Sequence, residues 1–194
     1  MKKKKSVFWM NLALVLALIM GLAFPAANVS AAGKSKQDKV LVVYFSATGT
    51  TKSAAKKVKK AAGGTLYQIK AAQPYTSADL NYDNDGCRAN TEQQDGSVRP
   101  EIKGKVKNIK KYDVIFIGYP IWWGKEPMII RTFLESYNLE GKKIVPFCTS
   151  GGSGISGSMK GIREFAKGAE VAEGKDLTGS SAKSVKNWVK KNVK

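Results

Sequence analysis

Residues 40–58 read VLVVYFSATGTTKSAAKKV, and this stretch decides the fold. Its first six residues are apolar and mostly β-branched or aromatic, a pattern typical of a buried parallel strand. Hydroxyl side chains and one glycine follow at 46–51, where a lysine- and alanine-rich helical segment begins. This turn sets the unpaired N–H groups and the positive pole of a helix N-terminus beside hydroxyl donors. Because the turn holds no lysine or arginine, we expect it to bind a phosphate by hydrogen bonds alone.

Two other interpretations of this turn fit its residues less well. The letters TGTTKS before a helix are similar to the phosphate loop of nucleoside triphosphatases. However, the glycine that precedes the lysine in that loop is missing, and so is its earlier glycine. A helix cap alone needs one hydroxyl, whereas four lie within these six residues.

Strand-like and helix-like segments alternate through the rest of the chain. We expect strands at 40–45, 65–69, 113–118, 143–149 and 170–173, and helices at 50–62, 101–110, 127–137, 156–166 and 181–192. Between them, residues 71–100 form a long polar stretch, and so long a loop in a compact domain usually has a function. The alternation predicts an α/β fold with a doubly wound, five-stranded parallel sheet. Its ligand should lie beyond the carboxyl ends of the strands.

A second unusual loop, GYPIWWGKEP, follows the strand at 113–118. Loops at strand ends are usually polar, so the adjacent Trp122 and Trp123 suggest a flat ring stacked on an indole. The flanking prolines would fix the shape of the loop. The alternative is that both indoles only cover the edge of the core. Since adjacent side chains point in different directions, one indole could stack while the other packs.

A third loop, TSGGSGISG at 149–157, follows the strand at 143–149. Gly152, Gly154 and Gly157 have the spacing of a dinucleotide-binding fingerprint. That fingerprint normally opens the first βαβ unit of a sheet, whereas this loop follows the penultimate strand. We expect instead that its backbone groups border the edge of a ring. A phosphate, a flat aromatic and a ring edge together indicate flavin mononucleotide (FMN).

These motifs resemble a known family. Residues 42–58 match the flavodoxin signature at Ser46, Thr48, Gly49, Thr51 and Ala55, and the YPIWWG and CTSGGSG loops resemble a narrower group of bacterial flavodoxin-like proteins. The resemblance runs from Lys39 to the C-terminus and implies the flavodoxin fold, with sheet order 2-1-3-4-5 and noncovalent FMN. It implies that the phosphate contacts Ser46, Thr48, Gly49, Thr50 and Thr51, and that the isoalloxazine is bordered by Pro120, Ile121, Trp122, Trp123, Gly124, Thr149, Ser150, Gly151 and Gly152.

The chain departs from typical flavodoxins in two ways. They are acidic, whereas this chain has 33 Lys and Arg against 15 Asp and Glu. They also place a tyrosine after the fourth strand, where this chain has glycine and serine. One face of the flavin would therefore be open, or covered by the 71–100 stretch through a residue such as Tyr82.

The first 32 residues have the pattern of an export signal. Lysines at 2–5 precede an almost wholly apolar run at 7–24, and small residues follow. The alternative is an uncleaved anchor, because the run is near the lower limit for spanning a bilayer. We therefore expect a signal peptide or anchor at 1–32, a linker at 33–38 and the FMN-binding domain at 39–194. Either way, the lysines at 2–5 place the domain outside the cytosol.

The excess of basic residues indicates which partners the protein attracts. No nucleic-acid motif occurs, so we expect attraction to an anionic cell envelope or membrane surface, or to an acidic protein, and no nucleic acid. The chain has no histidine, which excludes Ser-His-Asp and Cys-His catalysis and argues against zinc. Cys87 and Cys148 lack motif spacing and are expected to be separate, with a disulfide as the alternative in an exported chain.

Three functions are compatible with these residues. The first is an exported FMN protein that carries electrons to a redox partner protein or small acceptor, with no catalytic residue of its own and no metal. The second is an FMN-dependent oxidoreductase that passes electrons from NAD(P)H to quinones, favoured by an open ring face. The third is a flavin-free binding module that kept the fold.

Overall fold

The parallel sheet that forms the centre of the molecule confirms the predicted fold class. The computed structural model describes residues 38–193. Its strands are β1 (Val40–Tyr44), β2 (Thr65–Gln68), β3 (Val114–Pro120), β4 (Lys143–Thr149), β5 (Glu170–Val171) and β6 (Lys175–Asp176). They are ordered β2-β1-β3-β4-β5, with β6 also paired to β4, and every pairing is parallel. The predicted order 2-1-3-4-5 is therefore confirmed.

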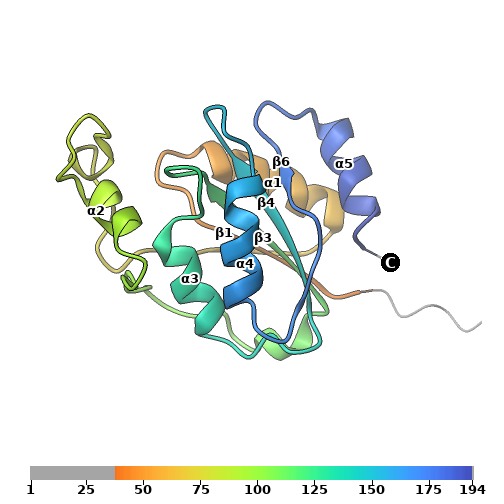
Figure 1. Ribbon diagram of the computed structural model, residues 1–194. Coiled ribbons are helices and arrows are strands. Elements are labelled where there is room, and N and C mark those ends of the chain that lie inside the picture. The colour runs from red at the N-terminus through yellow and green to blue at the C-terminus, as the bar shows by residue number, and fades with distance from the viewer. Residues whose placement is uncertain (1–37, 194) are drawn as a thin grey trace, which may run out of the picture. The chain divides into compact units, whose positions relative to one another are not determined.

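Five α-helices flank this sheet within residues 38–193. They are α1 (Thr50–Ala62), α2 (Arg88–Gln94), α3 (Met128–Glu135), α4 (Met159–Phe165) and α5 (Ala182–Lys190). Figure 1 shows α3 and α4 on one side of the sheet and α1 and α5 on the other, toward the right, while α2 stands apart on the left. None of the helices in the described part of the chain is long and apolar enough to cross a membrane.

Two hydrophobic cores lie on opposite faces of the sheet because side chains alternate along each strand. Leu41 and Val43 pack toward α3 and α4, whereas Val42 and Tyr44 pack toward α1 and α5. Both cores and the whole sheet belong to one compact unit, Ser35–Lys194. The predicted export segment at 1–32 and all of the linker except Asp38 lie outside the described residues.

The central strand contains an unusually close contact. Gly118 of β3 lies beside Phe147 of β4, and a Cβ atom on Gly118 would sit 2.2 Å from the tip of the Phe147 ring. Two carbon atoms that are not bonded to each other cannot come this close, so only glycine fits here unless the ring moves. Phe147 is fully buried and packs against Trp188 of α5, with ring centroids 6.3 Å apart. The ring therefore has little room to move.

The prediction of a helix at 101–110 is wrong. Ile102 instead forms an antiparallel bridge with Ala71, and only a short 3-10 turn, Ile109–Lys111, follows. Gly104 and Asn108 have φ of 80° and 52°. A right-handed helix cannot continue through such residues. The segment is therefore extended and irregular, although Val106 and Ile109 are buried.

The polar stretch at 71–100 is an ordered lobe that contains α2. Its ends are tied by two backbone hydrogen bonds, Ala72 N–H to Glu101 O and Lys103 N–H to Lys70 O, both 2.8 Å long. Inside the lobe, the Glu92 carboxylate accepts hydrogen bonds from the Tyr75 hydroxyl (2.5 Å) and the Arg88 guanidinium (2.6 Å). Glu92 is only 7% exposed, so this cluster gives the lobe a polar centre of its own.

Both cysteines are free and buried. Burial raises the pKa of the Cys148 thiol, and the nearby Asp176 carboxylate adds to the effect. We expect iodoacetamide to modify Cys87 and Cys148 at least about a hundredfold more slowly in the native protein than in the urea-unfolded chain. Mass spectrometry of timed samples measures both rates. Rapid modification of either thiol without denaturant would contradict the burial described here.

Candidate functional site

A cleft of about 380 Å³ opens at the carboxyl ends of β1, β3 and β4. It is lined by Ser46, Ala47, Thr48, Thr50, Thr51, Leu80, Tyr82, Pro120, Ile121, Trp122, Thr149, Ser150 and Gly151. The structure thus brings together residues from all three loops singled out in the sequence. Gly49, Trp123, Gly124 and Gly152 of the predicted set do not line the cleft. Ala47, Leu80 and Tyr82 line it although they were not in that set.

The first loop leaves the N-terminus of α1 open. Gly49 caps the helix with φ at 97°, a conformation that favours glycine, and no side chain caps the first turn. The Ser46 hydroxyl accepts a hydrogen bond from Gly49 N–H at 3.1 Å, which fixes the bend. The exposed hydroxyls of Thr48 and Thr50 border the cleft. Uncapped N–H groups, the helix dipole and hydroxyl donors together suit an anion.

Thr51 has a different place from its neighbours in this loop. It is only 1% exposed, and its hydroxyl lies 2.8 Å from the hydroxyl of Thr149 at the end of β4. Either oxygen could donate this hydrogen bond. The contact joins the first loop to the third across the floor of the cleft. Thr51 therefore orients the loops, in addition to contributing to the cleft wall.

The second loop is a tight turn from Trp122 to Lys125. The N–H of each of these residues donates to the carbonyl of the other at 3.0 Å. Trp123 and Gly124, between them, have φ of 50° and 73°. Two successive positive φ values define a type I′ turn, and an aromatic residue in that conformation is rare and strained. The lobe supports this turn, because Gln93 donates from Nε2 to Trp122 O at 2.9 Å.

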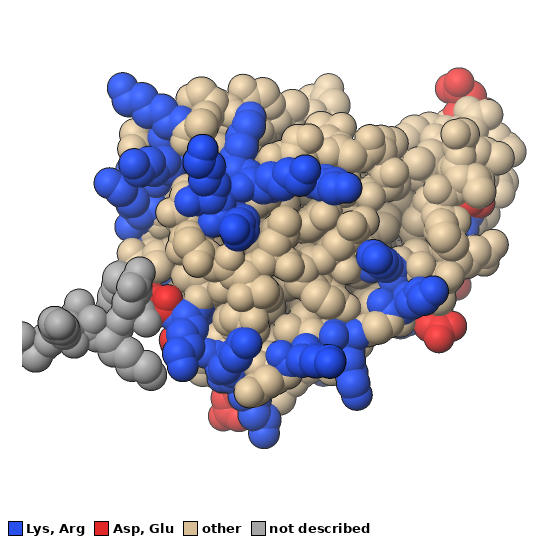
Figure 2. All heavy atoms as spheres, turned by 180° about the vertical axis from the view of Figure 1, so that it is seen from behind, with Lys and Arg blue, Asp and Glu red and all other residues tan. Residues whose placement is uncertain are grey.

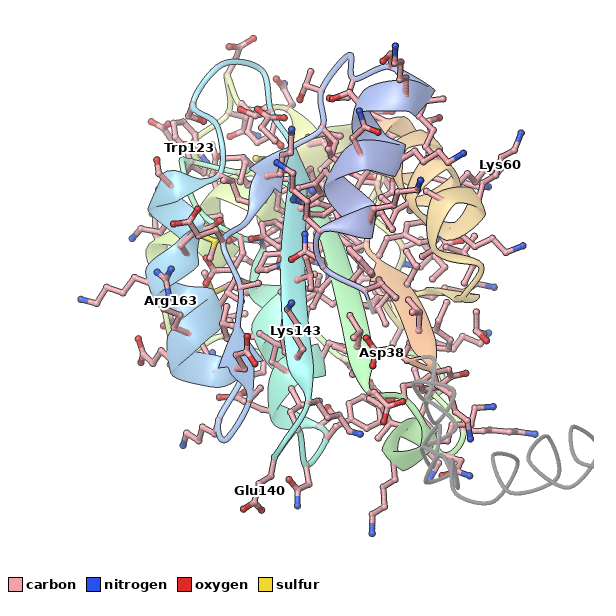
Figure 3. All side chains as sticks on the ribbon, turned by 90° about the vertical axis from the view of Figure 1, so that its right-hand side faces the viewer. Asp38, Lys60, Trp123, Glu140, Lys143 and Arg163 are labelled. Atoms are coloured by element: carbon pink, nitrogen blue, oxygen red, sulfur yellow. The ribbon has the colours of Figure 1, made fainter. Side chains whose placement is uncertain are left out.

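The two indoles of this turn have separate environments. Trp122 is 4% exposed and meets Phe45 and Tyr75 edge to face, with ring centroids 5.6 and 5.2 Å away. Trp123 is 58% exposed, and its Nε1 donates to Asn90 Oδ1 at 2.8 Å. Its ring also meets Tyr82 edge to face at 6.0 Å. Trp122 is thus buried in the wall of the cleft, while Trp123 lies outside it at the rim, next to Tyr82 and at the upper left in Figure 3.

The third loop is held from below by residues that the sequence analysis missed. Ser150 N–H donates to the Thr178 hydroxyl at 2.8 Å, and that hydroxyl lies 2.6 Å from Asp176 Oδ1. The Ser150 hydroxyl in turn accepts from Gly152 N–H at 3.0 Å. Asp176 is the last residue of β6, which pairs with β4, and Thr178 lies two residues further on. Their spacing, Asp-x-Thr, is the sequence signal that could have identified this support.

One glycine of the third loop, Gly157, is required by close packing. A Cβ atom on Gly157 would sit 2.3 Å from the Gly124 carbonyl oxygen. The start of α4 therefore presses directly against the second loop. This close approach explains Gly157 without a dinucleotide. It also places the second and third loops in fixed positions relative to each other.

A buried ion pair lies behind the second loop. Glu126 is 1% exposed and accepts from Arg131 Nε at 2.8 Å. Burial raises the pKa of the Glu126 carboxyl above its ordinary value of 4.5, and the Arg131 guanidinium only partly opposes this. The folded state therefore holds this proton more tightly than the unfolded chain does. As the pH rises above 4.5, this group consequently lowers the stability of the fold.

We expect Glu126→Gln to remove this pH-dependent cost. Relative to the unchanged protein, the free energy of unfolding of the variant should rise between pH 4.5 and 7. Urea unfolding at both pH values measures the difference. Glu135→Gln is the control of opposite sign, because hydrogen bonding to Arg99 lowers the pKa of Glu135. A Glu126→Gln difference that falls with pH would refute the assignment.

Comparison with known proteins agrees with this arrangement. The flavodoxin family profile matches residues 39–192. A crystal structure of a candidate flavoprotein from Bacteroides eggerthii is 49% identical, with a TM-score of 0.76, and covers 79% of this chain and 96% of its own. A second, from Bacteroides uniformis, is 44% identical with a TM-score of 0.76, over 80% and 99% of the two chains.

A more distant structure contains a ligand. The flavoprotein of Lactobacillus acidophilus, solved in complex with FMN, is 27% identical with a TM-score of 0.62, over 72% of this chain and 93% of its own. A comparison with curated proteins finds no match. The sheet order, the cleft at its carboxyl edge and a profile match over most of the sequence lead to one conclusion. The chain belongs to the flavodoxin family.

Proposed function

We propose that the chain binds FMN noncovalently in the 380 Å³ cleft and uses it to carry electrons. The observation that carries this proposal is the uncapped N-terminus of α1 at one end of a cleft whose other end has aromatic walls. The first end suits a phosphate and the second a flat ring. The complex of the Lactobacillus acidophilus flavoprotein with FMN supports the same ligand. When bound, FMN would supply one- and two-electron redox chemistry.

Each part of the chain has a separate role in this proposal. The hydroxyls of Thr48 and Thr50 and the first N–H groups of α1 bind the phosphate, and Ser46 holds Gly49 in the bend. None of the residues 38–193 that line the cleft is charged, so neutral donors and the helix dipole oppose the phosphate charge. Leu80 and Tyr82 of the lobe bring apolar surface over one side of the ring. They exclude water from it.

The turn from Trp122 to Lys125 would border the reactive part of the ring. Its backbone is held by Gln93, by Asn90 through the Trp123 indole and by Gly157 beneath Gly124. A rigid turn presents its N–H and carbonyl groups in one orientation. Such fixed groups favour one redox state of the ring over another and so set its potential.

A titration with FMN tests this proposal. Purified protein is mixed with FMN, and its visible absorbance and fluorescence are followed before and after reduction with dithionite. We expect the flavin fluorescence to change on binding. The reduced complex should return electrons to an added one-electron acceptor. A protein that leaves the spectrum of added FMN unchanged would refute the proposal and support the flavin-free module.

One observation favours a second function, an FMN-dependent reductase. The exposed loop at 150–154 contains only serine and glycine, and a Cβ atom on Gly151 would meet nothing within 4 Å. No aromatic side chain from this loop can cover the ring, so a small substrate could approach it. Steady-state oxidation of NAD(P)H in the presence of a quinone distinguishes the two functions. Turnover would establish the reductase, and its absence would leave the carrier.

We further propose that the domain works outside the cytosol. The lysines at 2–5 and the apolar run at 7–24 support this location. Expression of the whole chain, followed by cell fractionation and determination of the N-terminal sequence, tests it. Recovery of the uncut chain from the cytosol would contradict it.

A further inference from the structure

One face of the molecule is covered by lysines. Helices α1 and α5 pack side by side, and Lys57 Nζ joins them by donating to Ser180 O at 2.8 Å. The lysine face, as we call it here, consists of the exposed residues Lys52, Lys56, Lys57, Lys59, Lys60, Lys183, Lys186, Lys190 and Lys191. Figure 2 shows blue side chains gathered at the upper left, where these helices lie when seen from behind. No Asp or Glu occurs at 39–78 or at 177–194.

Most of these lysines repel one another along their helices, and only Lys59, Lys60 and Lys190 lie in last turns, where the helix dipole favours a cation. Helix α1 buries Ala54, Ala55 and Val58 against the sheet, which leaves lysine on nearly all of its outer side. Lys56 follows Lys52 by one turn and Lys60 follows Lys56, and such like-charged pairs destabilise a helix. No glutamate in either helix offsets them. The cost suggests that the charge serves something outside the fold.

The lysine face lies away from the aromatic rim of the cleft, and only Lys57 lines a pocket beside the phosphate loop, with Thr48 and Thr50. The carboxylates of the lobe, Asp79, Asp83 and Asp85, lie near the rim residue Tyr82 in the sequence, and Figure 2 shows red side chains on the side opposite α1 and α5. Figure 3 shows Lys60 pointing away from one side of the sheet, with Trp123 at the other. Contact through the lysine face therefore leaves the aromatic rim of the cleft accessible.

We propose that the lysine face docks on a bilayer that contains anionic phospholipid. Every cation on the face is a lysine, and a compact charge on a flexible stem suits mobile headgroups, whereas ordered phosphate sites favour arginine. Among the described residues, the exposed large hydrophobic side chains are Tyr82 and Trp123, at the rim. The face thus lacks the apolar centre of a stable protein interface and the aromatic platform for single-stranded nucleic acid.

The apolar run at 7–24 is an independent reason to expect a membrane nearby. Whether it is cleaved or retained, it brings the chain to a bilayer during export. The docking proposal does not depend on FMN, because α1 and α5 present their lysines with or without a ligand in the cleft. It goes beyond electron transfer by fixing which surface of the protein faces the lipid.

Vesicle sedimentation tests the proposal. The unit Ser35–Lys194, which contains the whole sheet and both cores, is mixed with phosphatidylcholine vesicles with or without phosphatidylglycerol. We expect binding only to the anionic vesicles, and weaker binding as salt is raised. The triple variant Lys56→Glu, Lys60→Glu and Lys186→Glu should bind at least about tenfold more weakly.

A matched variant separates the effect of the lysine face from the effect of net charge on vesicle binding. Lys105→Glu, Lys107→Glu and Lys110→Glu change the same total charge on exposed lysines before β3. This variant should lose much less affinity than the first. Equal losses would overturn the assignment to α1 and α5, and failure of the unchanged protein to bind anionic vesicles at low salt would overturn docking itself. Tighter binding to duplex DNA than to vesicles at the same salt would overturn the lipid assignment. Circular dichroism verifies that all variants are folded.

Discussion

Thr48→Asp is expected to weaken FMN binding by roughly a hundredfold while leaving riboflavin binding nearly unchanged. Thr48 is exposed in the first loop and borders the cleft at the N-terminus of α1. In the proposed complex a carboxylate there would face the phosphate, and like charges this close repel by about 2–3 kcal/mol near a protein surface. Riboflavin has the same ring without the phosphate, so it avoids the repulsion.

Fluorescence titration with both flavins measures this effect. Thr48→Val is the matched control, because it removes the hydroxyl without adding charge and should cost FMN binding only about tenfold. If Thr48→Asp weakened FMN and riboflavin equally, the phosphate would not lie at this loop. If it weakened neither, the cleft would not hold the flavin at all.

Gly118→Ala is expected to lower the free energy of unfolding by about 3 kcal/mol. The new methyl group would sit 2.2 Å from the Phe147 ring, in the middle of the sheet. The ring is confined by Trp188, so the strain spreads into β3 and β4, which also carry the second and third loops of the cleft. We therefore expect FMN affinity to fall together with stability.

Urea unfolding of the unchanged protein, Gly118→Ala, Phe147→Leu and the double variant isolates this contact. In a Phe147→Leu background the ring atoms that meet the new methyl group are gone, so Gly118→Ala should cost less than about 1 kcal/mol. Gly96→Ala is a control, because the nearest atom to its Cβ would be 3.7 Å away. An equal cost of Gly118→Ala in both backgrounds would show that the strain has another source.

The sequence predicts the sheet well because each strand is a dense apolar run followed by a turn. The segment 143–149 matches β4 residue for residue, and Gly63 ends α1 in a left-handed conformation as its position suggests. The prediction of a helix at 101–110 is wrong. It is suggested by the spacing of Val106 and Ile109, which is compatible with a helix. That spacing does not reveal the positive φ of Gly104 and Asn108.

The cleft is predicted where its residues come from the loop of one strand, and missed where they come from distant segments. Pro120 and Ile121 follow β3 directly and line the cleft as expected. Leu80 reaches it from the lobe, through a chain path that no local pattern encodes. Tyr82 also comes from the lobe, and the sequence analysis names it only as an example of a residue that could cover the flavin. The division between Trp122 and Trp123 depends on the strained turn. Only the backbone angles, not the letters WW, reveal which indole is buried.

The bridge between Ala71 and Ile102 makes the intervening residues an insertion that the sheet does not require. Its two ends lie side by side, so a chain that turned back at this point would leave β2 and β3 where they are. Changes in its length or composition therefore reach Leu80 and Tyr82 without disturbing the phosphate loop. Evolution can thus alter what approaches the ring separately from what holds the phosphate.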